Sequence, residues 1–179
     1  MLNYDADLEL FRDNFRRFMN EHIAPHYEQW ELEGLMPRSV WNALGENGFL
    51  CVDVPEEYGG YGVPTHYSLM LVEESARAGF SALSTGISCH SEIAAPYILH
   101  IGTEAQKQYW LPKMVSGEVV GAIGMTEPGA GSDLQAMRSN AILQGEHYIL
   151  NGSKTFISNG QHADLVVLAL SLIHISEPT

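Results

Sequence analysis

Residues 121–133 have the sequence GAIGMTEPGAGSD, in which a short apolar run changes abruptly into a loop broken by glycine and proline. The apolar half is typical of a strand. In the second half, glycines allow backbone N–H groups to approach a ligand closely, and successive N–H groups in such a turn bind a pyrophosphate without Lys or Arg. The same letters also fit an ordinary strand with its exit turn, so both interpretations stay open on spacing alone.

A nicotinamide dinucleotide site is the first interpretation that these glycines suggest, and the sequence argues against it. Gly129 and Gly131 supply the G-x-G of the G-x-G-x-x-G fingerprint, but Leu134 stands where the third glycine belongs. The fingerprint must also open a long helix within a βαβ unit. Short β-prone pieces and turn signals follow instead, which favours another kind of ligand.

The residues just before the loop have the pattern expected of a wall for a flat heteroaromatic ring. Ile123 and Met125 alternate with Gly124, and Thr126 adds a hydroxyl group at the strand end. Residues 154–160, KTFISNG, repeat this character before an Asn-Gly turn. An apolar edge with a few polar tips suits such a ring, although each segment alone is also an ordinary strand.

Composition excludes several classes of function. The chain has 9 Lys and Arg against 22 Asp and Glu, a formal charge of −13 that offers no basic stripe to nucleic acid. The two cysteines, Cys51 and Cys89, have neither disulfide-framework nor zinc-site spacing, which fits a reducing, intracellular setting. No stretch approaches the ~20 apolar residues of a membrane span, and the acidic start is unlike a signal peptide. We therefore expect a cytoplasmic, bacterial protein.

The first two-thirds of the chain predict helices. The first is an amphipathic helix with Asp5 or Asp7 as N-cap, ended by Pro25, and its apolar positions are Leu8, Phe11, Phe15, Phe18 and Ile23. A second helix around Trp41 stops at Gly48, and a third runs from Thr65 to Gly79. Residues 93–102 predict another helix, and the T-x-x-Q of residues 103–106 predicts a capping box before the next.

The spacing of apolar residues changes from a helical to a strand-like pattern near Ser116. Short β-prone pieces then alternate with Gly-Glu and two Asn-Gly turns, as in successive hairpins, and a last strand is expected from Asp164. We predict an α+β, multidomain chain: a helical domain over residues 1–118, part of a β domain over 119–170, and a tail over 171–179.

Other groups of residues give weaker evidence for a catalytic or metal-binding site. His22 and His26 have a metal-binding spacing, but the intervening Pro25 favours two surface residues. Cys89 and His90 are adjacent and lack an orienting third group, so a packing role is expected. Glu127 has no evident partner that would make it a base, and the GSKT of residues 152–155 lacks the spacing of a P-loop. We therefore predict neither a metal site nor a catalytic residue within this chain.

Taken together, MTEPGAGSDLQ (125–135) and LNGSKTFISNG (150–160) resemble the flavin-binding segments of the acyl-CoA dehydrogenases. VPEEYGGYG (54–62), GTEAQKQYWLPKMVSGE (102–118) and the opening helix are similar to the helical N-terminal domain of that family, nearest to its long-chain-type members. The resemblance covers about residues 5–170 in order. Five ordered matches are a specific signal although each alone is modest.

The resemblance implies a helical N-terminal domain, a middle β-barrel domain and FAD as cofactor. It places Ile123, Met125 and Thr126 along the isoalloxazine, Gly131 and Ser132 along the loop, and Phe156, Ile157 and Ser158 on the second flavin wall. It also implies that Ser132 reaches the acyl-CoA substrate. Phe156 replaces the Trp of many relatives and so lacks an indole N–H.

The activity that the resemblance implies is α,β-dehydrogenation of a fatty acyl-CoA to the trans-2-enoyl-CoA, with electrons passing to electron-transfer flavoprotein. The full-length protein would be a homo-oligomer, a tetramer in the family. An acyl-CoA oxidase, which passes electrons to oxygen, and a non-catalytic helical binding module are the alternatives.

The family's catalytic base comes from a C-terminal four-helix bundle, and the resemblance implies that this chain is truncated before it. We therefore expect the chain to be inactive alone. Residues 171–179, SLIHISEPT, do not resemble the family's continuation and are expected to be a non-native tail.

Overall fold

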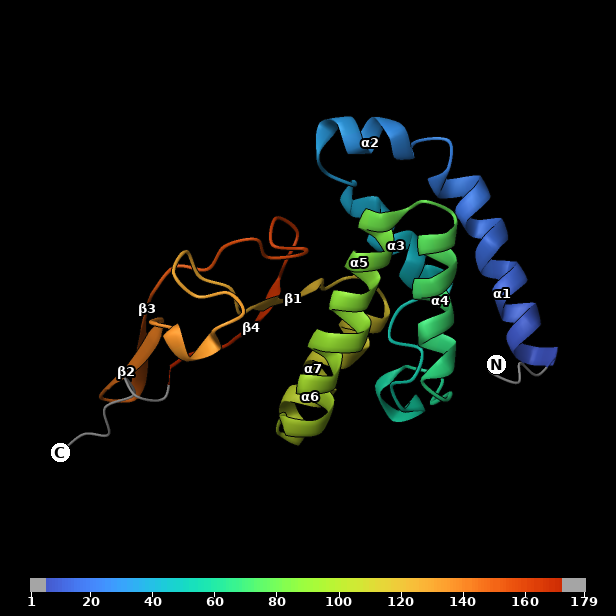
Figure 1. Ribbon diagram of the computed structural model, residues 1–179. Coiled ribbons are helices and arrows are strands. Elements are labelled where there is room, and N and C mark those ends of the chain that lie inside the picture. The colour runs from blue at the N-terminus through green and yellow to red at the C-terminus, as the bar shows by residue number, and fades with distance from the viewer. Residues whose placement is uncertain (1–5, 172–179) are drawn as a thin grey trace.

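The structure, a computed structural model, describes residues 6–171. The expected N-cap Asp5 and, apart from Ser171, the expected non-native tail lie outside the described residues. A helical part is followed by a smaller part made of strands and loops (Figure 1). The helices are α1 Ala6–Phe18, α2 Tyr27–Glu33, α3 Arg38–Glu46, α4 His66–Arg77, α5 Ser81–Ile87, α6 Ala95–Ile101 and α7 Glu104–Val115, and the strands are β1 Gly121–Gly124, β2 Asn140–Gln144, β3 His147–Asn151 and β4 Leu165–Leu168.

Helix α1 forms where the sequence predicts an amphipathic helix. Leu8, Phe15 and Phe18 face the core, while acidic residues in its first turn and Arg16 and Arg17 in its last turn complement the helix dipole. Asp7 lies within this first turn, so its expected role as N-cap is wrong. A π-helical turn, Met19–Ile23, continues α1 and ends before Pro25, the predicted stop.

The other predicted helices are confirmed with small changes. Helix α4 follows Thr65 and ends before Gly79, and α7 begins with the predicted capping box, in which both Thr103 and Gln106 make their reciprocal bonds. The turn-rich segment after Asp53 contains one 3-10 turn, Glu56–Tyr58. Helix α2, only seven residues long, is absent from the sequence-based expectation.

A large apolar cluster holds the helical part together. Trp41, Leu44, Phe15, Leu71 and Ile87 are among its fully buried members, and Val120, which directly precedes β1, belongs to the same cluster. Burying a side chain of this size stabilises the fold by about 1.5–3 kcal/mol each. The start of the strand part is therefore anchored in the helical core.

The strands form two small pairs. The hairpin of β2 and β3 turns at Gly145 and Glu146, as predicted, and pairs Asn140 with Asn151 in antiparallel register. The expected second hairpin is wrong, because residues 152–164 contain no strand and β4 pairs with β1 in parallel, Gly121 with Leu165. The two strand pairs do not close a barrel within the described residues.

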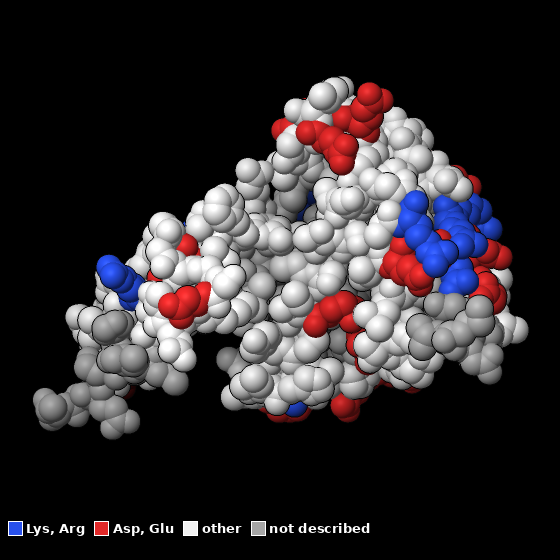
Figure 2. Space-filling view, viewed as in Figure 1, with Lys and Arg blue, Asp and Glu red and all other residues white. Residues whose placement is uncertain are grey.

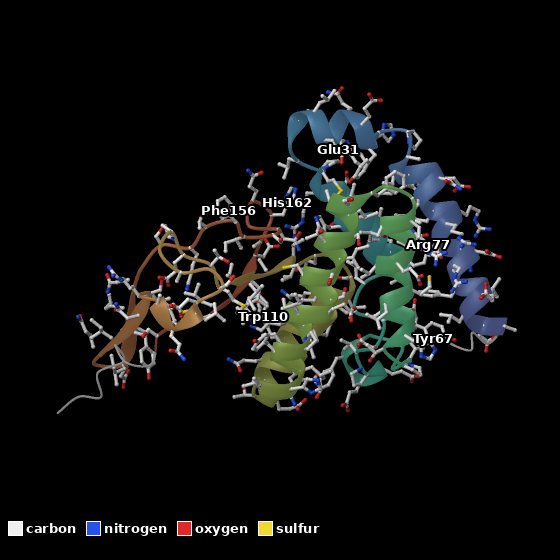
Figure 3. The ribbon with its side chains drawn as sticks, viewed as in Figure 1. Glu31, Tyr67, Arg77, Trp110, Phe156 and His162 are labelled. Carbon is white, nitrogen blue, oxygen red and sulfur yellow. The ribbon has the colours of Figure 1, made fainter. Side chains whose placement is uncertain are left out.

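Polar groups join the two parts. Arg38 donates to His162 O at 2.8 Å and pairs with Asp164 Oδ2 at 2.6 Å, while Val120 N donates to the same carboxylate at 2.9 Å. Figure 3 shows His162 at this junction, between the strand part and the helices. This network orients β4 toward the start of β1 and so sets the approach of both strands to the helices.

Charge is unevenly distributed on the face in view. Lys and Arg gather at one edge of the helical part, around α1 and α4, where carboxylates lie among them (Figure 2). Buried Glu74 of α4 accepts two hydrogen bonds from Arg16 of α1, at 2.7 and 3.0 Å. Arg16 is therefore engaged with a carboxylate of the neighbouring helix. No helix among residues 6–171 is long and apolar enough to cross a membrane.

Candidate functional site

A cavity of about 400 Å³ lies where the helical part meets β1. Strand β1 and its exit supply Ile123, Met125 and Thr126 to one side of it, as the alternation of these residues predicts. Phe156, Ile157 and Ser158 also line this cavity, so six of the eight residues proposed for cofactor binding lie around it. The structure therefore brings together two segments that are separated in sequence.

Residues 154–158, here called the second wall, are tied to the exit of β1. Thr155 N donates to Thr126 O at 2.9 Å, and Lys154 Nζ donates to Met125 O at 3.1 Å. Phe156 has a φ of 55° and is 92% exposed, and it lies beside the helices at the junction (Figure 3). Its ring is thus available to a ligand.

The helical side of the cavity comes from α4, α5 and the π-helical segment Ser88–Ala94. Ser84, Thr85 and Ser88 supply hydroxyl groups, and Val72, Cys89 and Ile93 supply apolar surface. Single π-helical turns within α-helices occur often at functional sites. These residues were not predicted as part of a site, although the run of small polar residues in SALSTGISCHS could have indicated a cavity wall.

Gly131 and Ser132 do not line this cavity. Both are exposed on the loop that leaves β1, and an added Cβ atom at Gly131 would meet no atom within 4 Å. Their backbone is therefore open to a ligand that extends along the loop from the cavity, as a pyrophosphate group would.

Glu127 has the partners that the sequence did not reveal. It lies buried below the loop, accepts from Lys154 Nζ at 2.8 Å, and receives the backbone N–H groups of Arg138 and Ser139 at 2.8 and 2.9 Å. Lys154 and these donors lower the pKa of Glu127 to about 2. A carboxylate so firmly ionised is a poor proton acceptor, and it lines a different cavity from Ile123, Met125 and Thr126.

His90 has a structural position, as the sequence analysis predicts. It is fully buried, its Nε2 lies 3.0 Å from Met114 O, and Gly121 N donates to its Nδ1 at 2.9 Å. Burial lowers the pKa of His90 to about 4, so the ring is neutral near pH 7. It therefore joins α7 to the start of β1 and does not face the cavity.

The adjacent Cys89 lines the cavity with a largely buried thiol. Burial raises its pKa, and Sγ lies 3.7 Å from Ser158 O. The exposed His22 and His26 lie apart from any metal-binding group, since residues 6–171 contain no cluster of three His, Cys, Asp or Glu side chains that could hold a metal ion.

A second, larger cavity of about 700 Å³ adjoins the first. The two share Thr85, Ile157 and Ser158, and the second continues between aromatic side chains of the helical part, Tyr27, Trp30 and Trp41. Among the described residues, no Asp or Glu lines the first cavity, and Glu31 is the one carboxylate on the second. The first cavity thus offers an apolar surface with hydroxyl tips.

Comparisons with known proteins agree with this architecture. Residues 5–118 match the family described as acyl-CoA dehydrogenase, N-terminal domain, and residues 122–176 match the acyl-CoA dehydrogenase, middle domain. The long-chain specific acyl-CoA dehydrogenase, mitochondrial, of Sus scrofa is 40% identical over 165 residues, which cover 92% of this chain and 38% of that protein. The chain thus spans well under half of this relative's length.

Solved structures give the same result. An acyl-CoA dehydrogenase from Geobacillus kaustophilus superposes with a TM-score of 0.93 at 48% identity, covering 99% of this chain and 46% of the other. An acyl-CoA dehydrogenase from Bacillus anthracis, solved in complex with FAD, superposes with a TM-score of 0.88 at 30% identity, covering 97% of this chain and 30% of that one.

Proposed function

This chain belongs to the acyl-CoA dehydrogenase family, and we propose that it is the part of an FAD-dependent acyl-CoA dehydrogenase that holds the flavin ring. The observation that carries the proposal is the cavity in which Ile123, Met125 and Thr126 of one segment meet Phe156, Ile157 and Ser158 of another. An apolar strand edge, an exposed aromatic ring and hydroxyl groups fit a flat heteroaromatic ligand.

The loop after β1 fits the remainder of the cofactor. In an acidic chain, pyrophosphate has to be bound by local dipoles, and the open backbone at Gly131 with the Ser132 hydroxyl offers such donors. We propose that Ser132 also contacts the acyl-CoA. FAD, when bound, supplies the acceptor for the hydride equivalent that leaves the β-carbon of the substrate.

The substrate is proposed to be a fatty acyl-CoA. The adjoining 700 Å³ cavity, which shares Thr85, Ile157 and Ser158 with the flavin cavity, supplies largely aromatic and apolar space beside the reacting position. We propose electron-transfer flavoprotein as the electron acceptor and a homotetramer as the state of the full-length protein. We also propose a helical domain over residues 1–118 and a β-barrel domain that begins within residues 119–170. The proposed location is the cytoplasm.

The catalytic base is proposed to lie outside this chain. Among the described residues, no carboxylate lines the flavin cavity, and Glu127 is held ionised by Lys154 on the far side of the loop. A general base needs to be within hydrogen-bond reach of the proton that it removes. The chain would therefore bind flavin without catalysing the reaction.

Two measurements test this function. Titrating purified 1–179 with FAD should quench flavin fluorescence saturably, and adding an acyl-CoA under anaerobic conditions should leave the flavin absorbance unchanged. The full-length protein should bleach its flavin with the same substrate and reduce electron-transfer flavoprotein. Failure of both proteins to bind FAD would contradict the proposal, and peroxide formation by the full-length protein would indicate an oxidase.

A further inference from the structure

One asparagine connects the second wall to two other elements that surround the flavin cavity. Asn159 directly follows the second wall, and its side-chain Nδ2 donates to Gly86 O of α5 at 3.0 Å and to Gly121 O of β1 at 3.1 Å. The carboxamide thus uses its donor group on two carbonyls from different parts of the fold. This single side chain connects the second wall to the helical part and to β1.

The backbone at Asn159 also limits which residue can stand there. Its φ of 62° lies in the left-handed region, which asparagine tolerates better than most residues other than glycine. Gly160 N donates to Ile157 O at 2.9 Å and His162 N donates to Asn159 O at 2.8 Å, so the chain turns sharply here. The direction in which the second wall ends therefore depends on this residue.

The second wall has few other attachments at this end. Its start is tied down by Thr155 and Lys154, but Phe156 is almost fully exposed and Ser158 is exposed as well. The Cys89 Sγ contact with Ser158 O, at 3.7 Å, is long. At the end of the wall, the two Asn159 hydrogen bonds are therefore the closest polar attachments to α5 and β1, and the next attachment along the chain is at His162, whose carbonyl accepts from Arg38 at 2.8 Å.

We propose that Asn159 is a positioning residue that fixes Phe156, Ile157 and Ser158 against α5 and β1 and so sets the shape of the flavin cavity. The identity of the ligand rests on the proposed function, whereas the restraint on the wall does not. The side chain of Asn159 acts through the wall, and we assign it no chemical step.

Two variants test the restraint. Asn159→Gly keeps a backbone that adopts the left-handed region readily and removes both hydrogen bonds. Asn159→Asp keeps the shape and places carboxylate oxygen where two carbonyl oxygens need a donor. Gln144→Glu is the matched control, because it makes the same neutral-to-acidic change at an exposed position of β2 that lines neither cavity.

The Cys89 thiol provides a readout that needs no flavin. Its rate of reaction with a thiol reagent, measured well below the melting temperature, reports how often the wall moves away from the helical side. Cys51 is fully buried in the core and serves as an internal reference for global unfolding. Losing both hydrogen bonds should accelerate Cys89 labelling about tenfold or more in each Asn159 variant, without accelerating Cys51 labelling.

FAD affinity supplies the second readout. Both Asn159 variants should bind FAD about tenfold more weakly, and Gln144→Glu should match the unmodified chain. Unchanged Cys89 labelling in both variants, or equal acceleration at Cys51, would overturn the positioning role. A response at Cys89 in a chain that binds no FAD would support the positioning role and contradict the proposed ligand instead.

Discussion

The chemistry of single residues explains why the acidic side chain nearest the glycine loop is structural. Glu127 follows Thr126 directly, yet it lines a different cavity from Thr126 and pairs with Lys154. Since Lys154 also contacts Met125 O, this one ammonium group holds the loop to the second wall. A motif residue can thus serve the site by fixing its backbone.

Replacing Lys154 with Met should remove the ion pair with Glu127 and the hydrogen bond to Met125 O. Glu127 would lose the main cause of its lowered pKa, which should rise from about 2 toward the ordinary value of 4.5. Because a lowered carboxyl pKa stabilises the fold above the unfolded pKa, unfolding measured by urea should show less loss of stability between pH 4.5 and pH 2 in the variant than in the original chain. Arg17→Met on α1, which removes a guanidinium that bonds the neutral Asn14 side chain at 3.0 Å, should leave that pH dependence unchanged, and an identical profile for both variants would contradict the assignment.

His90 should make folding sensitive to mild acid. Its pKa is about 4 in the folded chain and about 6.5 when unfolded, so the unfolded state binds more protons between these values. Stability should therefore fall as the pH drops from 6.5 to 4, by about 3 kcal/mol at most. His90→Asn should flatten this slope and cost about 1–3 kcal/mol at pH 7.5, because the shorter side chain leaves a buried partner unpaired.

The matched variant His147→Asn changes an exposed histidine of β3. Chemical unfolding across pH 4–8 should show the original slope for this control. A slope that persists in His90→Asn would assign the acid sensitivity to another group.

At the scale of elements, the helices were predictable to the extent that their signals are local. The capping box of α7 and the apolar period of α1 depend on residues within a turn or two of each other. Helix α2 was missed because only one of its seven residues, Tyr27, is buried, so the helix shows no apolar stripe. The second hairpin was mispredicted for a similar reason. Asn159-Gly160 does form a turn, but the Asn159 side chain bonds to α5 and β1, and the turn does not join two paired strands.

The candidate site, too, was predictable only where its signals are local in sequence. The two segments that line the 400 Å³ cavity could be picked out because their alternation and turn residues lie within short stretches of sequence. The residues of α4 and α5 that close the cavity could not, since their part in the site depends on how helices pack. The parallel pairing of β1 with β4 was equally hidden, because two short apolar runs do not reveal which strand they neighbour.

Helix α3 and the turn after α7 approach each other closely at Gly45. An added Cβ at Gly45 would lie 2.1 Å from Ser116 O, a backbone atom that has little room to move. Gly45→Ala should therefore lower the free energy of unfolding by about 1–3 kcal/mol despite the better helix propensity of alanine. Gly129→Ala, where an added Cβ meets nothing within 4 Å, should be near neutral in the same denaturation experiment.

The whole molecule is unevenly stable, with a deep helical core and a thinly packed strand part. Every residue of β3 is exposed, whereas β1 lies largely buried against the π-helical segment Ser88–Ala94. Amide hydrogen exchange should therefore be fast across 140–151 and much slower in α4 and β1. Equal protection of the hairpin and the core helices would show that the strand part is stabilised by contacts beyond those described.

The parallel pairing of β1 with β4 also bears on how the chain is synthesised. As the ribosome releases the polypeptide from its N-terminus, the seven α-helices of residues 6–171 emerge before β1, and β1 has no partner strand until Leu165–Leu168 emerge. During that interval the edge of β1 lacks its partner strand and is open to mispairing with other nascent chains. Premature release before Leu165 should therefore give a folded helical part with an unsatisfied, aggregation-prone strand edge.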